Sequence, residues 1–135
     1  MAKKILVVDD EYYMHRLMQH HLLRAGYEMI TAKNGREAVE KATNETPDLV
    51  IMDVMMAEMD GLSALKQLKQ TQNTREIPVI MITAHDQPAL REQAAAAGAL
   101  HFVAKDNLIE LQLIISQLAA IASEAAKRKN CEENR

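Results

Sequence analysis

The sequence predicts an α/β fold in which helices cover both faces of a five-stranded parallel sheet. Short apolar runs rich in β-branched residues alternate five times with longer segments of helical period. Two of these runs, 49–52 and 79–82, contain no polar residue, which is typical of parallel strands buried on both faces. The chain has 135 residues, 48% hydrophobic and 26% charged, and this balance indicates one globular domain.

Each strand and helix has its own signal in the sequence. Strands are predicted at 5–8, 28–32, 49–53, 79–83 and 101–104, and the run at 28–32 is polar enough to be an edge strand. Helices are predicted at about 14–25, 36–44, 62–70, 88–97 and 108–127. Gly26 and Gly98 follow the first and fourth of these helices, where glycine commonly ends a helix.

The last predicted helix, 108–127, differs from the others in length and apolar content. It would extend about 30 Å, and Asn107 with Glu110 forms a capping pair at its start. Its apolar residues are too many for one stripe: Leu108, Ile109, Leu111, Leu113, Ile114, Ile115, Leu118, Ala120, Ile121 and Ala122. They form either a wide core face or a contact for a second subunit or a following domain. We assign 1–127 to one domain with an extended last helix and 128–135 to a flexible polar tail.

Charge and cysteine content exclude several classes of protein. Sixteen Lys and Arg residues against nineteen Asp and Glu residues give a net charge of −3, which disfavours nonspecific binding to nucleic acid or membrane. The single cysteine, Cys131, excludes an intrachain disulfide framework and a cysteine-based zinc cluster. No apolar run has the length of a signal peptide core or a membrane span. We therefore expect a cytoplasmic protein.

Reactive polar groups gather at four of the five predicted strand ends. Asp9 and Asp10 follow the first strand, Asp53 ends the third, Thr83 ends the fourth and Lys105 follows the fifth. Ligands of open parallel sheets bind outside the carboxyl ends of the strands. For any one of these residues a capping or solvated role is the simpler explanation. Their convergence on three carboxylates, one hydroxyl and one ammonium instead predicts a reactive site.

The three carboxylates imply a cation, because close carboxylates repel one another and raise at least one pKa. Mg²⁺ is the cation that such oxygen ligands prefer when phosphate completes its coordination. With Mg²⁺ and Lys105 nearby, one aspartate could stay ionised and attack phosphorus to form an aspartyl phosphate. The Thr83 hydroxyl could then hydrogen-bond a phosphoryl oxygen.

These residues resemble those of response-regulator receiver domains of two-component signalling, the family of the chemotaxis regulators. The resemblance covers nearly all of 3–125 and rests on a set of motifs in this order: 5–10 (ILVVDD), 53–56 (DVMM) with 59–61 (MDG), Thr83-Ala84, and Lys105. It implies a flavodoxin-like doubly wound (βα)5 fold with strand order 2-1-3-4-5. Each motif alone is weak, but their order and spacing together are specific to this family.

The resemblance also implies a role for each site residue. Asp53 would accept phosphate from a histidine kinase or phosphotransfer protein, or from a small phosphodonor. Asp10, Asp53 and the Met55 carbonyl would bind Mg²⁺, or Mn²⁺ in its place, and Asp9 would act through water or through its charge. Thr83 and Lys105 would hold the phosphoryl oxygens. In these terms the protein is a signalling module that assists only its own phosphorylation and dephosphorylation, not an enzyme with an independent substrate.

Phe102 matches the family's aromatic switch position, which is thought to move inward as Thr83 shifts toward the phosphate. A purely structural role as a core aromatic explains Phe102 equally well. The resemblance implies that phosphorylation remodels the surface of the fourth helix, fifth strand and fifth helix. That surface would bind a downstream protein or output domain, or a second copy of the chain.

The sequence departs from the family at two loops. Asp106 follows Lys105 where the family usually has proline in a cis bond, so we expect a trans peptide here. Asp106 could pair with Lys105, but the more economical expectation is that it caps the fifth helix. Ala57 stands where proline is frequent, which should loosen the loop after Asp53.

Two positions are expected to tune the lifetime of the phosphoaspartate. Met55 and His85 each lie two residues beyond a site residue, Asp53 and Thr83 respectively. Apolar Met55 would slow hydrolysis by excluding water, whereas His85 could orient a water molecule for attack. The remaining histidines are expected to be helix-surface or packing residues rather than metal ligands: His15, His20, His21 and His101.

Three other functions compete with a phosphorylation-controlled binding module. A small aspartate-nucleophile phosphatase would need a second aspartate two positions beyond its nucleophile and a cap domain, and neither is found. Flavin or dinucleotide binding lacks the glycine-rich motif after a strand. A degenerate receiver used only as a scaffold conflicts with the complete set of site residues, although Asp106 keeps this alternative open.

No basic helix-turn-helix follows residue 127, so direct nucleic-acid binding is not expected.

Overall fold

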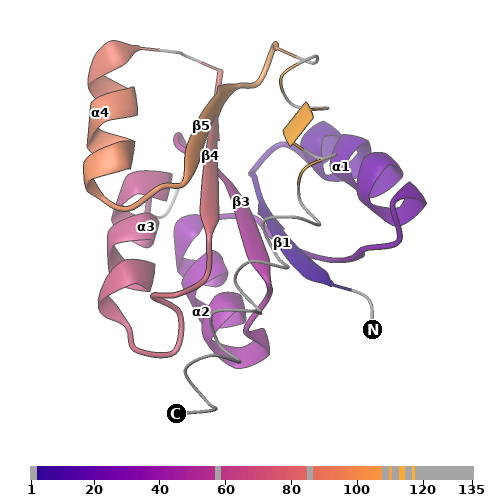
Figure 1. The fold of residues 1–135 in the computed structure, drawn as a ribbon, viewed down its shortest axis with the longest axis horizontal. Helices are drawn as coiled ribbons and strands as arrows, with labels where there is room; N and C mark the ends of the chain where they lie inside the picture. Colours follow the sequence, from indigo (N-terminus) through magenta and orange to yellow (C-terminus); the bar gives the residue numbers. More distant parts are fainter. Residues whose placement is uncertain are drawn as a thin grey trace.

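A computed structural model describes residues 3–56, 59–84 and 87–107, together with 110, 113, 114 and 117. Five strands alternate with four helices along this part of the chain (Figure 1). In chain order they are β1 (Lys4–Val8), α1 (Tyr12–Arg24), β2 (Glu28–Ala32), α2 (Gly35–Glu45), β3 (Leu49–Asp53), α3 (Gly61–Gln70), β4 (Val79–Thr83), α4 (Pro88–Ala96) and β5 (His101–Ala104). The predicted strands and the first four predicted helices are confirmed to within two residues at each end.

The five strands form one parallel sheet with the order β2-β1-β3-β4-β5. Leu6 pairs with Val50, Met52 with Met81, and Met81 in turn with Phe102. The strand at 28–32 is an edge strand, as its polarity predicts. Both the flavodoxin-like fold and the strand order implied by the resemblance are confirmed. This order places β3 at the centre of the sheet, with β1 and β4 on its two sides.

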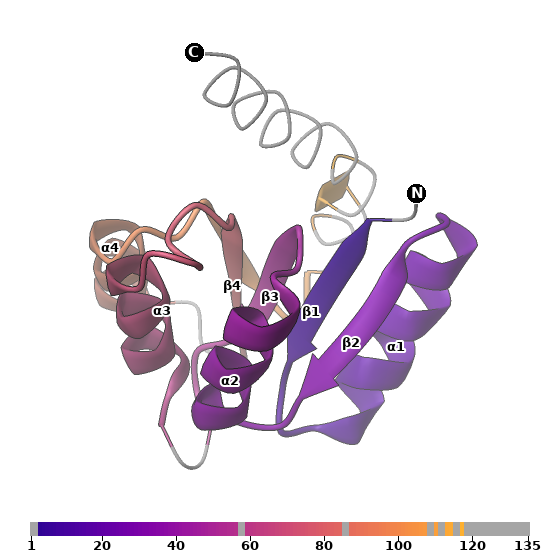
Figure 2. The same ribbon diagram turned by 90° about the horizontal axis from the view of Figure 1, so that it is seen from below.

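Alternate residues of each inner strand point into two separate cores. Helices α2, α3 and α4 cover one face of the sheet, and α1 covers the other (Figure 2). On β1, Leu6 and Val8 pack toward the first group of helices, whereas Ile5 and Val7 pack toward α1. Burial on both faces explains why β3 and β4 lack polar residues up to their last position.

Local capping sets where the helices begin and end. The Asn34 side chain accepts a hydrogen bond from Glu37 N (2.8 Å) at the start of α2. Asp60 accepts one from Ser63 N (2.8 Å) at the start of α3. Gly26 and Gly98 follow α1 and α4 with φ angles of 88° and 106°, a conformation that favours glycine. The predicted helix ends at these two glycines are confirmed.

Most of the predicted fifth helix, together with the tail at 128–135, lies outside the described residues. At its start, Glu110 N donates a hydrogen bond to Asn107 Oδ1 (3.1 Å), as the predicted capping pair requires. Of the two caps predicted for this helix, the Asn107–Glu110 pair is confirmed, whereas residues 108 and 109, which an Asp106 cap would bond, lie outside the described residues. Ile114 is buried in the core beside α1, whereas Leu113 is 57% exposed. Among the described residues no helix is long and apolar enough to cross a membrane.

Candidate functional site

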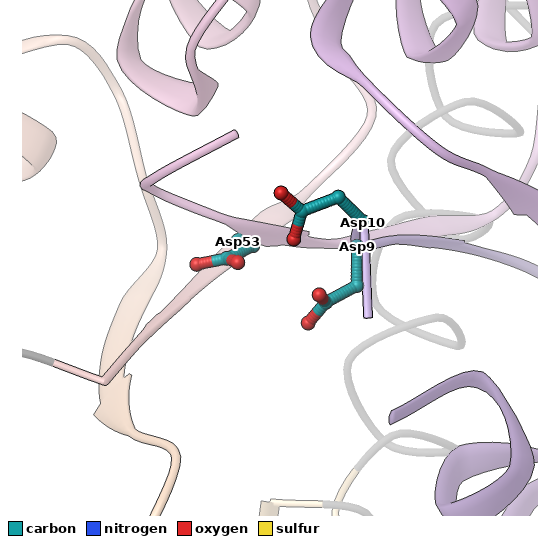
Figure 3. Close-up of side chains that lie close together, drawn as sticks. All are labelled: Asp9, Asp10 and Asp53. Atoms are coloured by element: carbon teal, nitrogen blue, oxygen red, sulfur yellow. The ribbon is translucent and has the colours of Figure 1, made fainter. Parts of the chain in front are cut away.

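Three carboxylates lie together at the carboxyl ends of β1 and β3. Asp53 is the last residue of β3, and Asp9 and Asp10 directly follow β1, its neighbour in the sheet. One carboxylate oxygen from each residue lies within 4.8 Å of the others. Figure 3 shows the Asp10 carboxylate extending from the end of β1 toward Asp53. Asp9 and Asp53 are buried, with 1% and 3% of their surfaces exposed, while Asp10 is exposed. The predicted convergence of these strand ends is confirmed.

Lys105 brings an ammonium group into this cluster from the end of β5. Its Nζ lies 2.8 Å from Asp9 Oδ2 and 2.9 Å from Asp53 Oδ2, and only 8% of the residue is exposed. Glu11 Oε1 is a third neighbour at 3.7 Å. The Lys105–Asp106 peptide is trans, as expected. Within the described part of the chain Asp106 is exposed and has no ion pair with Lys105.

Burial and charge shift the protonation of this cluster. Burial raises the pKa of both Asp9 and Asp53, and the hydrogen bonds from Lys105 offset only part of that effect. Burial by itself would lower the pKa of Lys105, but the hydrogen bonds and charges of Asp9 and Asp53 raise it above its ordinary value. Lys105 therefore stays charged at neutral pH. Asp9 and Asp53 share this one buried ammonium, and Asp10 adds a third carboxylate beside them, so the cluster lacks positive charge.

The donor set fits a hard divalent cation. Three carboxylate oxygens within 4.8 Å of one another are the oxygen ligands that Mg²⁺ and Mn²⁺ accept. A divalent ion beside Asp10 and Asp53 would also remove the excess negative charge of the cluster. Within the described part of the chain this is the one group of three or more such side chains able to hold a metal.

Thr83 lies on the other side of Asp53, at the end of β4. It is fully buried, and its strand pairs with β3 on one side and with β5 on the other. Lys105 N donates a hydrogen bond to the Thr83 carbonyl (2.7 Å), which ties the turn after β5 to the end of β4. Asp53 thus sits between the acidic end of β1 and the hydroxyl and ammonium supplied by β4 and β5.

The loop after Asp53 folds back over the strand end. Met55 N donates to Asp53 Oδ1 (3.2 Å), and Gly61 N donates to the Val54 carbonyl (2.8 Å). A Cβ atom at Gly61 would collide with the Asp53 carbonyl oxygen, so only glycine fits this close approach. Met55 itself is 58% exposed. Ala57 and His85 lie outside the described residues.

Phe102 packs inward from β5 and is held there by α4. Only 8% of the residue is exposed. The Arg91 guanidinium carbon lies 5.0 Å from the centre of the phenylalanine ring, and Arg91 Nη1 donates to the Phe102 carbonyl (3.4 Å). Helix α4, which comes after β4 and Thr83 in the chain, is thereby linked to Phe102 on β5.

The structure adds two residues to the site that the sequence analysis did not select. Glu11 reaches Lys105 from the first turn after β1, and its position next to Asp9-Asp10 in the sequence is the only signal for it. His15 is half-buried, and its Nε2 lies 2.7 Å from the Asp9 carbonyl oxygen. The prediction of a packing or surface role for His15 is therefore incomplete, because its side chain also contacts the Asp9 carbonyl oxygen of the site.

Comparison with known proteins assigns the family. The response regulator receiver domain model matches residues 5–116. The chemotaxis protein CheY of Bacillus subtilis is 42% identical over 106 residues, which cover 78% of this chain and 87% of that protein. The crystal structure of a chemotaxis response regulator of Vibrio cholerae has a TM-score of 0.79 and 31% identity, and covers 90% of this chain and 99% of that one. The chain belongs to the response regulator receiver domain family.

Other relatives are longer proteins. The chain spans 43% of the alkaline phosphatase synthesis transcriptional regulatory protein PhoP of Bacillus subtilis, with 43% identity over 105 residues. It spans 36% of a protein-glutamate methylesterase of Archaeoglobus fulgidus, with 40% identity over 128 residues. The match therefore defines a receiver, the signalling domain that such proteins share, and leaves any output to be identified.

Proposed function

We propose that Asp53 is the phosphoacceptor of this receiver. The observation that carries the proposal is its place in the sheet: Asp53 ends the central strand, with two carboxylates on one side and Thr83 and Lys105 on the other. Its Oδ2 contacts Lys105 and its Oδ1 accepts the Met55 N–H bond. Asp9 also contacts Lys105, but Asp53 is the member of the cluster whose strand pairs with β4, which ends in Thr83.

In the proposed reaction a carboxylate oxygen of Asp53 attacks the phosphorus of a phosphohistidine or of a small acyl phosphate. An oxygen–phosphorus bond forms while the bond from phosphorus to the imidazole nitrogen or to the acyl oxygen breaks. The imidazole takes a proton from solvent as it leaves, and an acyl donor leaves as a carboxylate. Lys105 and Thr83 then bind oxygens of the transferred group, which places a charge and a hydroxyl where negative charge accumulates.

Asp10, Asp53 and the Met55 carbonyl are the proposed ligands of Mg²⁺ or Mn²⁺, with Asp9 acting through water or charge. The bound cation supplies charge neutralisation for the phosphoryl oxygens. Lys105 already bridges Asp9 and Asp53. Asp10, the exposed member of the cluster, is therefore the carboxylate most accessible to an incoming ion.

Intact-protein mass spectrometry after incubation with acetyl phosphate and Mg²⁺ tests the phosphoacceptor. The wild type should gain one phosphoryl adduct of about 80 Da that hydroxylamine removes, as an acyl phosphate requires. Asp53→Asn should show no adduct, while Asp60→Asn, which alters a carboxylate at the start of α3, should still be labelled. An unlabelled wild type, beside a labelled control receiver, would favour a scaffold, and steady release of phosphate from an independent substrate would favour a phosphatase.

We also propose that phosphorylation acts on Thr83 and Phe102, and through them on the surface formed by α4, β5 and the following helix. This surface would bind a downstream protein, an output domain or a second copy of the chain, and the phosphodonor would be a histidine kinase or phosphotransfer protein in the cytoplasm. Phe102 is the only phenylalanine in the sequence, so fluorophenylalanine labelling gives one fluorine resonance. That resonance should shift on phosphorylation in the wild type and stay in place in Asp53→Asn.

Met55 and His85 are proposed to set how long the phosphoryl group stays on Asp53. Met55 N donates a hydrogen bond to Asp53 Oδ1, and an apolar side chain at this position would exclude water from the cluster. Met55→Asn should therefore speed the decay of the phosphoaspartate, and His85→Ala should slow it. Decay is followed by the loss of the phosphoryl adduct over time, and unchanged rates in both variants would contradict this role.

A further inference from the structure

The turn between β1 and α1 carries two of the three clustered carboxylates, and three hydrogen bonds converge on Asp9 within it. Asp9 N donates to the Ala32 carbonyl of β2 (3.1 Å). Glu11 N donates to Asp9 Oδ1 (2.8 Å). The third joins His15 Nε2 to the Asp9 carbonyl oxygen (2.7 Å). The main chain on both sides of Asp10 is therefore held, although Asp10 itself is exposed.

Asp10 differs from the other two carboxylates in having no side-chain support. Asp9 and Asp53 each contact Lys105 and each accept a backbone N–H. Within the part of the chain that the structure describes, no hydrogen bond or ion pair reaches the Asp10 carboxylate. The backbone torsions of residue 10 set the direction of its Cα–Cβ bond, and thereby which side-chain rotamers bring the carboxylate toward Asp53, as in Figure 3. These torsions depend on the two peptide planes that flank Asp10.

Each of these two planes is fixed by one of the hydrogen bonds. The plane that joins residues 10 and 11 carries Glu11 N–H, which Asp9 Oδ1 accepts. The plane that joins residues 9 and 10 carries the Asp9 carbonyl, and His15 is the side chain that bonds this oxygen. Because a carbonyl oxygen can only accept, His15 Nε2 must carry the proton in this contact. His15 is thus half of a two-bond support for Asp10.

We propose that His15 is a positioning residue for the cation site: it fixes the Asp9–Asp10 peptide plane and so holds the Asp10 carboxylate toward Asp53. The inference rests on the proposed cation site. Without the His15 bond the Asp9 carbonyl could turn, and the exposed Asp10 side chain would sample directions away from Asp53. Supporting residues of this kind typically change metal affinity about 10-fold to 100-fold when removed.

A purely structural role is the competing explanation, since loss of any helix-to-turn hydrogen bond lowers stability. Such a role would lower the free energy of unfolding without changing the affinity of the folded protein for a cation. Cation affinity and its recovery by a side chain that donates from the same place therefore separate the two explanations.

The test is an NMR titration of the full chain with Mg²⁺ alone, at one fixed pH, following the amide resonances of residues 9–11 and 53–55. His15→Leu removes the Nε2–H donor and puts an apolar side chain of similar size in its place. His15→Gln keeps an N–H donor close to the place of Nε2. His20→Leu is the matched control, because His20 lies on the same helix, is exposed, and contacts the His21 ring rather than the site.

We expect His15→Leu to raise the Mg²⁺ dissociation constant about 10-fold, His15→Gln to recover most of the affinity, and His20→Leu to match the wild type. Equal Mg²⁺ affinity in the wild type and in folded His15→Leu would overturn the inference. If His15→Leu does not fold, His15→Gln and His15→Asn decide it: the shorter amide of Asn should bind Mg²⁺ more weakly than Gln, and equal affinities contradict the proposal.

The outcomes also separate this inference from the proposed function. If the wild type binds Mg²⁺ but Asp53 gains no phosphoryl group, the proposed function fails while the His15 result stands. If the wild type is phosphorylated and His15→Leu binds Mg²⁺ normally, only the inference fails. A wild type that binds no Mg²⁺ at residues 9–11 and 53–55 overturns both.

Discussion

Two lysines at opposite ends of the sheet show how the same residue type serves two different tasks. Lys105, at the carboxyl ends of the strands, contacts Asp9 and Asp53 at 2.8 and 2.9 Å. Lys69, near the amino end of β4, donates instead to the main-chain carbonyls of Ile77 (2.7 Å) and Arg75 (3.2 Å). Buried carboxylates raise the pKa of Lys105, whereas burial lowers the pKa of Lys69.

The difference lies in what each ammonium neutralises. Lys69 ties the end of α3 to the loop before β4 through neutral carbonyl groups, and its stem packs beside Gly98. Lys105 balances only part of a cluster of negative charge. Burial of a lysine alone therefore does not indicate a functional site. A lysine beside more carboxylates than its single charge can neutralise does indicate one.

Removing each lysine in turn tests this distinction, and loss of Lys105 should have the largest effect of any substitution outside Asp53 itself. Lys105→Met should slow labelling of Asp53 by acetyl phosphate by about 100-fold or more, the scale expected when one charge-stabilising donor is lost. Lys69→Met should leave the labelling rate unchanged and lower the free energy of unfolding by about 1 kcal/mol, because two carbonyls lose their donor. Adduct formation over time and urea unfolding give the two readouts. Similar labelling rates in both variants would remove the distinction.

Two glycines extend the comparison to the backbone. Gly61 approaches the Asp53 carbonyl too closely for any Cβ atom, whereas Gly26, at the other end of the sheet, has no heavy atom within 4 Å of such a Cβ. We expect Gly61→Ala to lower the free energy of unfolding by up to about 3 kcal/mol through overpacking. Gly26→Ala should cost only about 1 kcal/mol, from its φ of 88°.

The two glycine variants should also differ in chemistry. A displaced Asp53 carbonyl moves the acceptor side chain, so Gly61→Ala should slow labelling even where the protein remains folded. Gly26→Ala should be labelled at the wild-type rate. Denaturant unfolding and labelling on the same samples provide both measurements. A slower rate in Gly26→Ala would show that labelling reports general stability rather than the local position of Asp53.

Much of this site could be predicted from the sequence because it depends on strand ends. Once 49–53 and 5–8 are recognised as parallel strands, the strand order implied by the resemblance makes them neighbours, so Asp53 and Asp9 lie close together. Lys105 follows β5, the strand at the edge of the sheet beyond β4. His15 could not be predicted in this way, because its contact with the Asp9 carbonyl depends on how the first turn of α1 leaves β1. The direction of a side chain after a turn is set by turn geometry, which residue spacing does not specify.

The start of the last helix shows a related limit. Asp106 and Asn107 are both good capping residues, and a cap prediction is uncertain by one position when two such residues are adjacent. The structure places the bond to Glu110 N on Asn107. The spacing of Asn107 and Glu110 thus predicted this bond correctly, but spacing alone also allowed Asp106 as a cap.

The smallest expected effect is the dependence of stability on the charge of the cluster. Burial raises the pKa of Asp9 and Asp53 above the ordinary carboxyl value of 3.8, so the folded protein binds more protons than the unfolded chain in acid. The free energy of unfolding should therefore fall as pH rises from about 3.8 through the raised pKa values. Lys105 remains charged throughout this range, because its pKa is raised.

At pH 7 without Mg²⁺, Asp53→Asn should therefore be more stable than the wild type by about 1 kcal/mol. Mg²⁺ should stabilise the wild type more than this variant, since a ligand stabilises only the form that binds it. Asp48→Asn, at the amino end of β3 where the side chain accepts the Lys4 N–H bond, should show neither effect. Urea unfolding between pH 4 and pH 7, with and without Mg²⁺, measures all three proteins. An Asp53→Asn variant less stable than the wild type without Mg²⁺ would mean that Lys105 compensates the buried carboxylates fully, and that the two ends of the sheet differ less than their geometry indicates.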